Sequence, residues 1–152
     1  MPLLTLKHHT LYYVTDGQLQ NPPLLLLHGF LGSHQDFVPL LPALAQHFYC
    51  IIPDLPGHGQ SIATVGHYGF PETAKALLSL LDFFNLSQTH VLGYSMGGRL
   101  ALYLACEDSR RCQRVILESA SPGLKTAEER LARIKRDQAI ARQLETTPLP
   151  IF

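Results

Sequence analysis

The chain has 152 residues, room for one domain, and 46% of them are apolar against 16% charged. This composition supports a folded core and excludes an intrinsically disordered chain. The formal net charge is zero, so nothing indicates nucleic acid or an anionic membrane surface as a partner. Apolar runs are shorter than the roughly 18 residues of a membrane span, the start lacks a signal-peptide pattern, and three cysteines without metal-ligand spacing fit a reduced compartment. We therefore expect a cytoplasmic protein.

Charge is distributed unevenly along the chain. Ten of the twelve basic residues lie between Arg99 and Arg142, so residues 1–98 sum to −3 and residues 99–152 to +3. A solvated surface helix with charged loops explains such a cluster, and so does an anionic ligand that faces part of it. The placement of individual arginines has to decide between the two.

Hydrophobic periodicity predicts strands and helices that alternate. In chain order these are a two-stranded hairpin over 3–15, a strand over 24–27, an amphipathic helix over 37–48 started by Ser33, a strand over 49–52, a helix opened by Pro71, a strand over 90–92, a helix over 97–106 and a strand over 114–117. This alternation predicts a mostly parallel sheet with helices on both faces.

The C-terminal part differs in character. Residues 126–129 (Thr-Ala-Glu-Glu) match a capping box, in which Thr126 and Glu129 each bond the other's backbone amide. The helix that starts there is highly charged, and it carries Arg130, Arg133 and Asp137 on one flank of a narrow apolar stripe. Prolines at 148 and 150 end the pattern.

One motif carries chemistry: Gly93-Tyr94-Ser95-Met96-Gly97 matches G-x-S-x-G between a predicted strand and a predicted helix. A nucleophile on so tight a turn sits in strained backbone, and the flanking glycines remove side chains that would collide. Ser95 is therefore the candidate nucleophile, at a helix start whose amide dipoles favour negative charge. The alternative is a glycine-rich corner with an exposed serine.

These residues resemble the α/β-hydrolase family. His28-Gly29-Phe30 is similar to that family's oxyanion loop, and residues 54–61 (Asp-Leu-Pro-Gly-His-Gly-Gln-Ser) resemble its D-x-P-G-x-G-x-S loop. The resemblance covers about residues 3–125. It implies that the backbone amides of Phe30 and Met96 form an oxyanion hole for Ser95.

Two further segments, 97–101 and 118–124, together with the helix from 127, resemble the lyase family of menaquinone and phylloquinone synthesis. Those lyases eliminate pyruvate from an enolpyruvyl precursor to give 2-succinyl-6-hydroxy-2,4-cyclohexadiene-1-carboxylate. The resemblance implies a small anionic substrate, no cofactor and no metal.

The same resemblance implies substrate-binding arginines, because guanidinium groups bind carboxylates bidentately. Arg99 lies one helical turn after Ser95, Arg133 and its neighbour Arg130 lie on the charged helix, and Tyr94 adjoins the nucleophile. Two alternatives remain open at this point. Arg99 could form a surface pair with Glu107 or Asp108, and Arg133 could form an i, i+4 pair with Asp137.

The sequence departs from the family at the triad, which runs Ser, then Asp or Glu, then His. All eight histidines precede Ser95, and the later aspartates, Asp108 and Asp137, do not follow a strand. His28 or His58 is an alternative base, although the family uses neither in that way. A serine without a base is a poor nucleophile, so we expect the 152-residue chain to be inactive alone.

The length of the chain, 152 residues, also fits a family member that lacks the later part with the triad histidine. We expect an α/β-hydrolase fold truncated after the sixth strand and the start of a cap, with residues 1–125 in the core and 126–152 in the helical cap. The strand at 114–117 would then be an exposed apolar sheet edge, prone to aggregation. The predicted function is the pyruvate-eliminating lyase; the alternatives are a small-molecule esterase of the same fold and a non-catalytic fragment.

Overall fold

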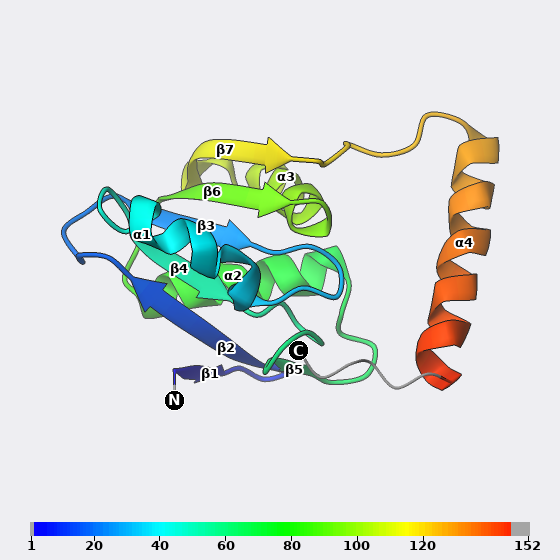
Figure 1. Ribbon diagram of the computed structural model, residues 1–152, viewed down its shortest axis with the longest axis horizontal. Coiled ribbons are helices and arrows are strands. Elements are labelled where there is room, and N and C mark those ends of the chain that lie inside the picture. The colour runs from blue at the N-terminus through cyan, green and yellow to red at the C-terminus, as the bar shows by residue number, and fades with distance from the viewer. Residues whose placement is uncertain (1, 147–152) are drawn as a thin grey trace. The chain divides into compact units, whose positions relative to one another are not determined.

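The structure of the protein is a computed structural model that describes residues 2–146 (Figure 1). Its strands are β1 (Leu3–Thr5), β2 (His9–Asp16), β3 (Pro23–Leu27), β4 (Tyr49–Pro53), β5 (Ile62–Ala63), β6 (Thr89–Tyr94) and β7 (Cys112–Glu118). Its helices are η1 (His34–Leu40), α1 (Leu41–Leu44), α2 (Phe70–Phe83), α3 (Met96–Glu107), η2 (Ser109–Arg111) and α4 (Ala127–Thr146), of which η1 and η2 are 3-10 helices.

The strands form one sheet in the order β1-β2-β4-β3-β6-β7, with β5 paired to β2. Strands β4, β3, β6 and β7 run parallel, while β1, β2 and β5 pair antiparallel, as the predicted hairpin requires. The two-residue strand β5 was not expected, which makes β7 the seventh strand rather than the sixth. The carboxyl ends of β3, β4, β6 and β7 therefore meet at one edge of the sheet, where the loops that carry the motifs begin.

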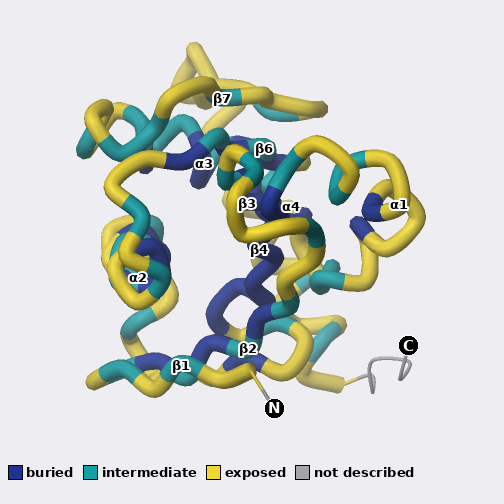
Figure 2. The backbone as a smooth tube through the Cα atoms, turned by 90° about the vertical axis from the view of Figure 1, so that its left-hand side faces the viewer, coloured by how far each residue is buried: buried dark blue, intermediate teal, exposed yellow. Residues whose placement is uncertain are grey.

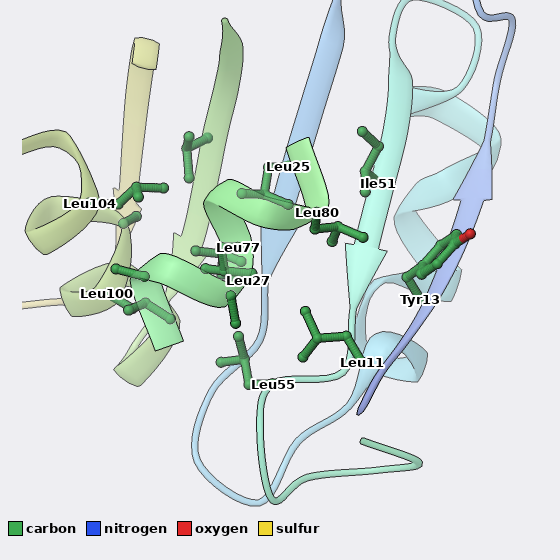
Figure 3. Packing of buried hydrophobic residues seen from close by; sticks show 14 of the residues in the cluster. Leu11, Tyr13, Leu25, Leu27, Ile51, Leu55, Leu77, Leu80, Leu100 and Leu104 are labelled. Carbon is green, nitrogen blue, oxygen red and sulfur yellow. The ribbon is translucent and has the colours of Figure 1, made fainter. Parts of the chain in front are cut away.

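Apolar side chains of the central strands alternate between two cores. Leu25, Leu27 and Ile51 pack with Leu77 and Leu80 of α2 and with residues of α3 on one face (Figure 3). The alternate residues of β3 and β4 pack against η1 and α1 on the other face. Figure 2 shows α1 and α2 on opposite sides of the buried strands. The predicted sheet with helices on both faces is confirmed.

The predicted helix over 37–48 is wrong in type. The segment forms the 3-10 helix η1 followed by the single-turn helix α1, and Ser33 caps η1 by accepting from the Gln35 amide at 3.2 Å. Pro39 and Pro42 lack the amide hydrogens that a continuous α-helix would use. The periodicity still identified the buried face, because Phe37 and Leu41 pack into the second core.

Strand β7 ends the sheet order and, among the described residues, pairs with β6 on one side only. Its Ile116 and Leu117 side chains are 54% and 41% exposed. The apolar edge expected from the sequence is therefore present in the described part of the chain, and its tendency to aggregate stays a prediction.

The chain divides into two compact units, residues 1–121 and 122–152. In the second unit, α4 begins with the predicted capping box, because Glu129 accepts from the Thr126 amide at 2.9 Å and Thr126 accepts from the Glu129 amide at 3.1 Å. None of the described residues of α4 is buried. The assignment of residues 1–125 to a core and 126–152 to a cap stays a prediction, and residues 147–152 lie outside the described residues. No helix in the described part of the chain has the length and apolar character needed to cross a membrane.

Candidate active site

The turn from β6 to α3 holds Ser95 in strained backbone. Its φ and ψ are 52° and −108°, a region that non-glycine residues rarely adopt and that costs about 1–3 kcal/mol. The Ser95 amide donates to the Glu118 carbonyl at 2.8 Å, and the Ser95 carbonyl accepts from the Arg99 amide at 3.1 Å. Ser95 therefore occupies a sharp strand-to-helix corner of the geometry expected for a nucleophile elbow.

The two flanking glycines are required by close backbone contacts. A Cβ at Gly93 would lie 2.3 Å from the Gly97 carbonyl oxygen, and one at Gly97 would lie 2.2 Å from the carbonyl oxygen of Leu27. Both contacts are far inside the van der Waals distance, and both are with backbone, which cannot turn aside. The spacing of glycines around Ser95 thus has the steric reason that the sequence predicted, and Gly97 also packs α3 onto the end of β3.

The loop after β3 lies directly against the elbow. A Cβ at Gly29 would lie 3.0 Å from the Tyr94 ring and 3.6 Å from the Cβ of Ser95. Phe30 follows Gly29 and its side chain is 53% exposed, while Met96 is the first residue of α3. The structure therefore brings the two segments that carry the predicted oxyanion amides next to Ser95, and the role of those amides stays a prediction.

His28 is not available as a base. It is fully buried, its Nδ1 lies 2.8 Å from the Gly29 carbonyl oxygen, and its Nε2 accepts from the Leu55 amide at 2.9 Å. Burial lowers the pKa of His28, which favours the neutral ring. The ring of His58 packs 5.3 Å from that of His28, and its Nδ1 lies 3.2 Å from the Pro56 carbonyl oxygen. Because both ring nitrogens of His28 have hydrogen-bond partners, His28 does not support the alternative in which an early histidine acts as the base, and that alternative stays a prediction for His58.

The loop at 54–61 contributes structure rather than a reactive group. Asp54 is fully buried and its Oδ1 accepts from both the amide and the Nδ1 of His34, at 2.7 and 2.8 Å. Its Oδ2 accepts from the Gln60 amide at 2.8 Å, and Ser61 donates to the Asp54 carbonyl at 2.6 Å. The motif therefore closes its own loop around Asp54 and ties that loop to the start of η1.

Two of the predicted substrate contacts lie on the first unit beside Ser95. Tyr94 is 48% exposed. Arg99 is half-buried on the first turn of α3, and its Nε is buried without a hydrogen-bond partner among the described residues. The alternative pairing of Arg99 with Glu107 or Asp108 is wrong in the described structure: neither ion pair forms among residues 2–146, and Asp108 pairs with Arg110 at 3.0 Å. The Nε of Arg99 is therefore a buried donor without a partner in residues 2–146, as is the Nε of Arg111.

The other two predicted contacts lie on α4, in the second unit. Arg133 pairs with Asp137 at 2.7 Å, as its alternative interpretation required. Arg130 donates to the carbonyls of Leu124 and Lys125 at 2.9 and 3.3 Å. Both guanidinium groups thus have local partners, and their binding of a ligand at Ser95 stays a prediction.

A cavity of about 390 Å³ adjoins the elbow on the η1 face of the sheet. Its polar lining comprises two carboxylates and two rings, and its apolar lining comes from η1, β6 and β7; the lining residues are His28, Asp36, Phe37, Leu40, Leu92, Tyr94, Ile116 and Glu118. Glu118, which ends β7 opposite Tyr94, was not among the site residues predicted from the sequence. Considering glutamates as well as aspartates at strand ends after Ser95 would have found it. Within residues 2–146, no group of three or more potential ligands is arranged to hold a metal ion.

Comparison with known proteins agrees with this geometry. The model of the alpha/beta hydrolase fold family matches residues 22–145. The 2-succinyl-6-hydroxy-2,4-cyclohexadiene-1-carboxylate synthase of Yersinia pseudotuberculosis is 37% identical over 134 residues, which are 88% of this chain and 48% of that enzyme. The chain therefore spans about half the length of the curated relatives it matches.

Solved structures show the same relation. MenH from S. aureus superimposes with a TM-score of 0.79 and 31% identity, over 93% of this chain and 53% of the other. The enol-lactonase from Burkholderia xenovorans LB400 gives a TM-score of 0.79 and 26% identity, over 90% of this chain and 54% of the other. With the elbow, the adjoining loop and the sheet order in place, the chain belongs to the α/β-hydrolase fold family.

Proposed function

We propose that the polypeptide carrying this chain is a lyase that eliminates pyruvate from an enolpyruvyl, multiply carboxylated cyclohexene, giving 2-succinyl-6-hydroxy-2,4-cyclohexadiene-1-carboxylate. The similarity to the Yersinia synthase, at 37% identity, supports the reaction class. The observation that carries the proposal beyond an ordinary hydrolase is Arg99. A half-buried cation with an unsatisfied Nε, one helical turn after the nucleophile, fits a carboxylate ligand better than a neutral ester.

In this proposal each group has one task. Ser95, assisted by an aspartate and a histidine of the family's triad, starts removal of a substrate proton, and the electrons released form a C=C bond and break the C–O bond to the enolpyruvyl group. That group leaves as the enolate of pyruvate and takes up a proton on carbon to become pyruvate. The amides of Phe30 and Met96 stabilise the oxyanion that develops, a type of contribution worth about 3–4 kcal/mol per donor. Arg99 and Tyr94 bind the substrate, with Arg133 and Arg130 as further carboxylate ligands.

The 152-residue chain by itself is proposed to be inactive. No histidine follows Ser95 in the sequence, and His28 uses both of its ring nitrogens in hydrogen bonds. Without a base at hydrogen-bond distance the Ser95 hydroxyl stays protonated and unreactive. A fluorescent phosphonate probe, which labels activated serines, tests this: we expect no labelling of the chain at Ser95, and labelling would refute its inactivity.

The decisive experiment measures pyruvate release with a lactate dehydrogenase-coupled assay, using the product of the complete reading frame. Arg99→Ala should lower turnover of the anionic substrate by at least tenfold. Arg110→Ala is the matched control, since Arg110 is 87% exposed and paired with Asp108 beyond the far end of α3. Equal effects of the two substitutions, or no pyruvate from the wild-type enzyme, would contradict the lyase proposal.

A small-molecule esterase is the second candidate. The loop after β3 favours it, because its apolar residues Phe30 and Leu31 are 53% and 46% exposed. The similarity to the enol-lactonase, at 26% identity, points in the same direction. A neutral p-nitrophenyl ester separates the candidates: an esterase cleaves it rapidly and tolerates Arg99→Ala, whereas the proposed lyase does not turn it over efficiently. Activity with neither substrate would favour the third interpretation, a non-catalytic fragment.

A further inference from the structure

Two loops meet at one buried imidazole, that of His28. Its Nε2 lies 2.9 Å from the Leu55 amide nitrogen, and its Nδ1 lies 2.8 Å from the Gly29 carbonyl oxygen. A backbone N–H can only donate and a carbonyl can only accept, so Nε2 is the bare nitrogen and Nδ1 carries the hydrogen. His28 is therefore neutral, held in one tautomer, and connects the loop after β3 to the loop after β4.

The bond to Gly29 controls the direction of the next amide. The Gly29 carbonyl accepts from the His28 ring and also from the Gly32 amide, at 3.1 Å. The peptide bond between Gly29 and Phe30 is planar and trans, so its C=O and its N–H point in opposite directions. Two donors that hold the carbonyl on one side thus hold the Phe30 N–H on the other side, away from the imidazole.

The other end of the connection is held equally firmly. Leu55 follows Asp54, whose buried carboxylate accepts from the amide and the ring of His34, at 2.7 and 2.8 Å, and from the Gln60 amide at 2.8 Å. The two loops are therefore bound together at two points, His28 to Leu55 and His34 to Asp54. This arrangement gives the Leu55 N–H a fixed position from which it can orient the imidazole ring.

We propose that His28 is a positioning residue: its buried neutral imidazole sets the direction of the Phe30 amide beside Ser95. The loop at 54–61 in turn holds this imidazole in place. The inference rests on the proposed function for the oxyanion that this amide stabilises. It assigns to His28 the control of a donor rather than the transfer of a proton. Gly29, whose added Cβ would lie 3.6 Å from the Ser95 Cβ, brings that donor to the nucleophile.

Two amide substitutions separate positioning from a purely structural role. The side chain of asparagine places its amide near the Nδ1 position of histidine, so His28→Asn keeps a donor for the Gly29 carbonyl and loses the acceptor for Leu55. Glutamine reaches the Nε2 position, so His28→Gln keeps the acceptor and loses the donor. Each variant removes one hydrogen bond from the same buried site, which makes their losses of stability comparable.

Turnover is then measured for both variants in the product of the complete reading frame, with Ser95→Ala as the blank. We expect His28→Gln to lower kcat by about 10- to 100-fold with KM within about twofold, short of the roughly 10²- to 10³-fold lost when an oxyanion donor is removed. His28→Asn should keep kcat within about threefold. Equal kcat values in two variants of equal stability would overturn the inference.

A second measurement does not depend on activity. Long-range ¹H–¹⁵N NMR spectra of the 152-residue chain at pH 7.5 report the tautomer of His28 directly. We expect a protonated Nδ1 and a bare Nε2, and the opposite tautomer or a rapidly exchanging ring would overturn the inference. If the wild-type enzyme turns over neither the anionic substrate nor the neutral ester, the proposed function fails, and the tautomer still decides whether His28 holds the Gly29 carbonyl.

Discussion

Gly97→Ala tests whether the elbow is packed as tightly as the contacts indicate. Gly97 lies inside α3, where an alanine in place of glycine ordinarily stabilises a helix by about 1 kcal/mol. The added Cβ would lie 2.2 Å from the Leu27 carbonyl oxygen and 2.5 Å from that of His28. Overpacking costs about 1–3 kcal/mol and occasionally more, and contacts this short with backbone, which require β3 or α3 to move, belong at the upper end of that range.

The gain in helix propensity stabilises the Gly97→Ala variant and the overpacking destabilises it, so the sign of the measured change in stability shows which effect is larger. We expect a net loss of about 2 kcal/mol or more in the free energy of unfolding, which lowers Tm by roughly 4–8 °C for a chain of this size. Urea denaturation followed by circular dichroism measures the first quantity, and a thermal scan measures the second. Both are compared with the wild-type chain under the same conditions.

Gly66→Ala is the matched control. Gly66 has no neighbour within 4 Å of an added Cβ, and its φ of 84° makes alanine unfavourable by about 1 kcal/mol through conformation alone. A Gly97→Ala variant as stable as the wild type, or more stable, would show that helix propensity outweighs the contacts with β3. The steric account of the G-x-S-x-G spacing would then be refuted.

Three further measurements follow from the geometry. Burial lowers the pKa of His28, and it also lowers that of His8, so the unfolded chain binds more protons than the folded chain below the ordinary pKa of 6.5. The stabilisation from these neutral rings should be complete above pH 6.5 and should fall as the pH drops toward the pKa values of the folded state. Urea midpoints measured between about pH 5 and pH 8 should depend less steeply on pH in His28→Gln than in the wild type. Burial raises the pKa of Cys50 to about 11. A thiol reagent at pH 8 should therefore modify the exposed Cys106 readily and react with the buried Cys50 only after denaturant is added. Fast reaction of Cys50 in the folded chain would contradict its burial. Thr126→Ala removes the capping box of α4 and should cost about 1 kcal/mol locally, seen as faster amide exchange in the first turn, whereas unchanged exchange would show that the cap contributes nothing.

Most of the fold was predictable from local patterns. The continuous apolar run at 24–27 became the central strand β3, and the glycines around Ser95 gave the strand-to-helix corner. The helix over 37–48 was not predictable in type from periodicity, because apolar spacing reports which face is buried and not whether Pro39 permits a full α-helical turn.

The candidate site was only partly predictable. Ser95, Tyr94 and the loop at Gly29 come together as expected, because parallel strands bring their carboxyl ends to one edge of the sheet. The partners of charged side chains were less accessible to sequence reasoning: Asp108 binds Arg110 rather than Arg99, a choice that depends on the turn after α3.

The amino-acid sequence by itself determined most of the alternation of strands and helices, the position of the G-x-S-x-G serine, and the lack of any histidine after it in these 152 residues. Those features depend on neighbours a few residues apart, or on composition alone. Tertiary structure decided what His28 does. Its two hydrogen-bond partners come from separate loops, and a donor on one side of the ring with an acceptor on the other arises only when β3 and β4 lie side by side.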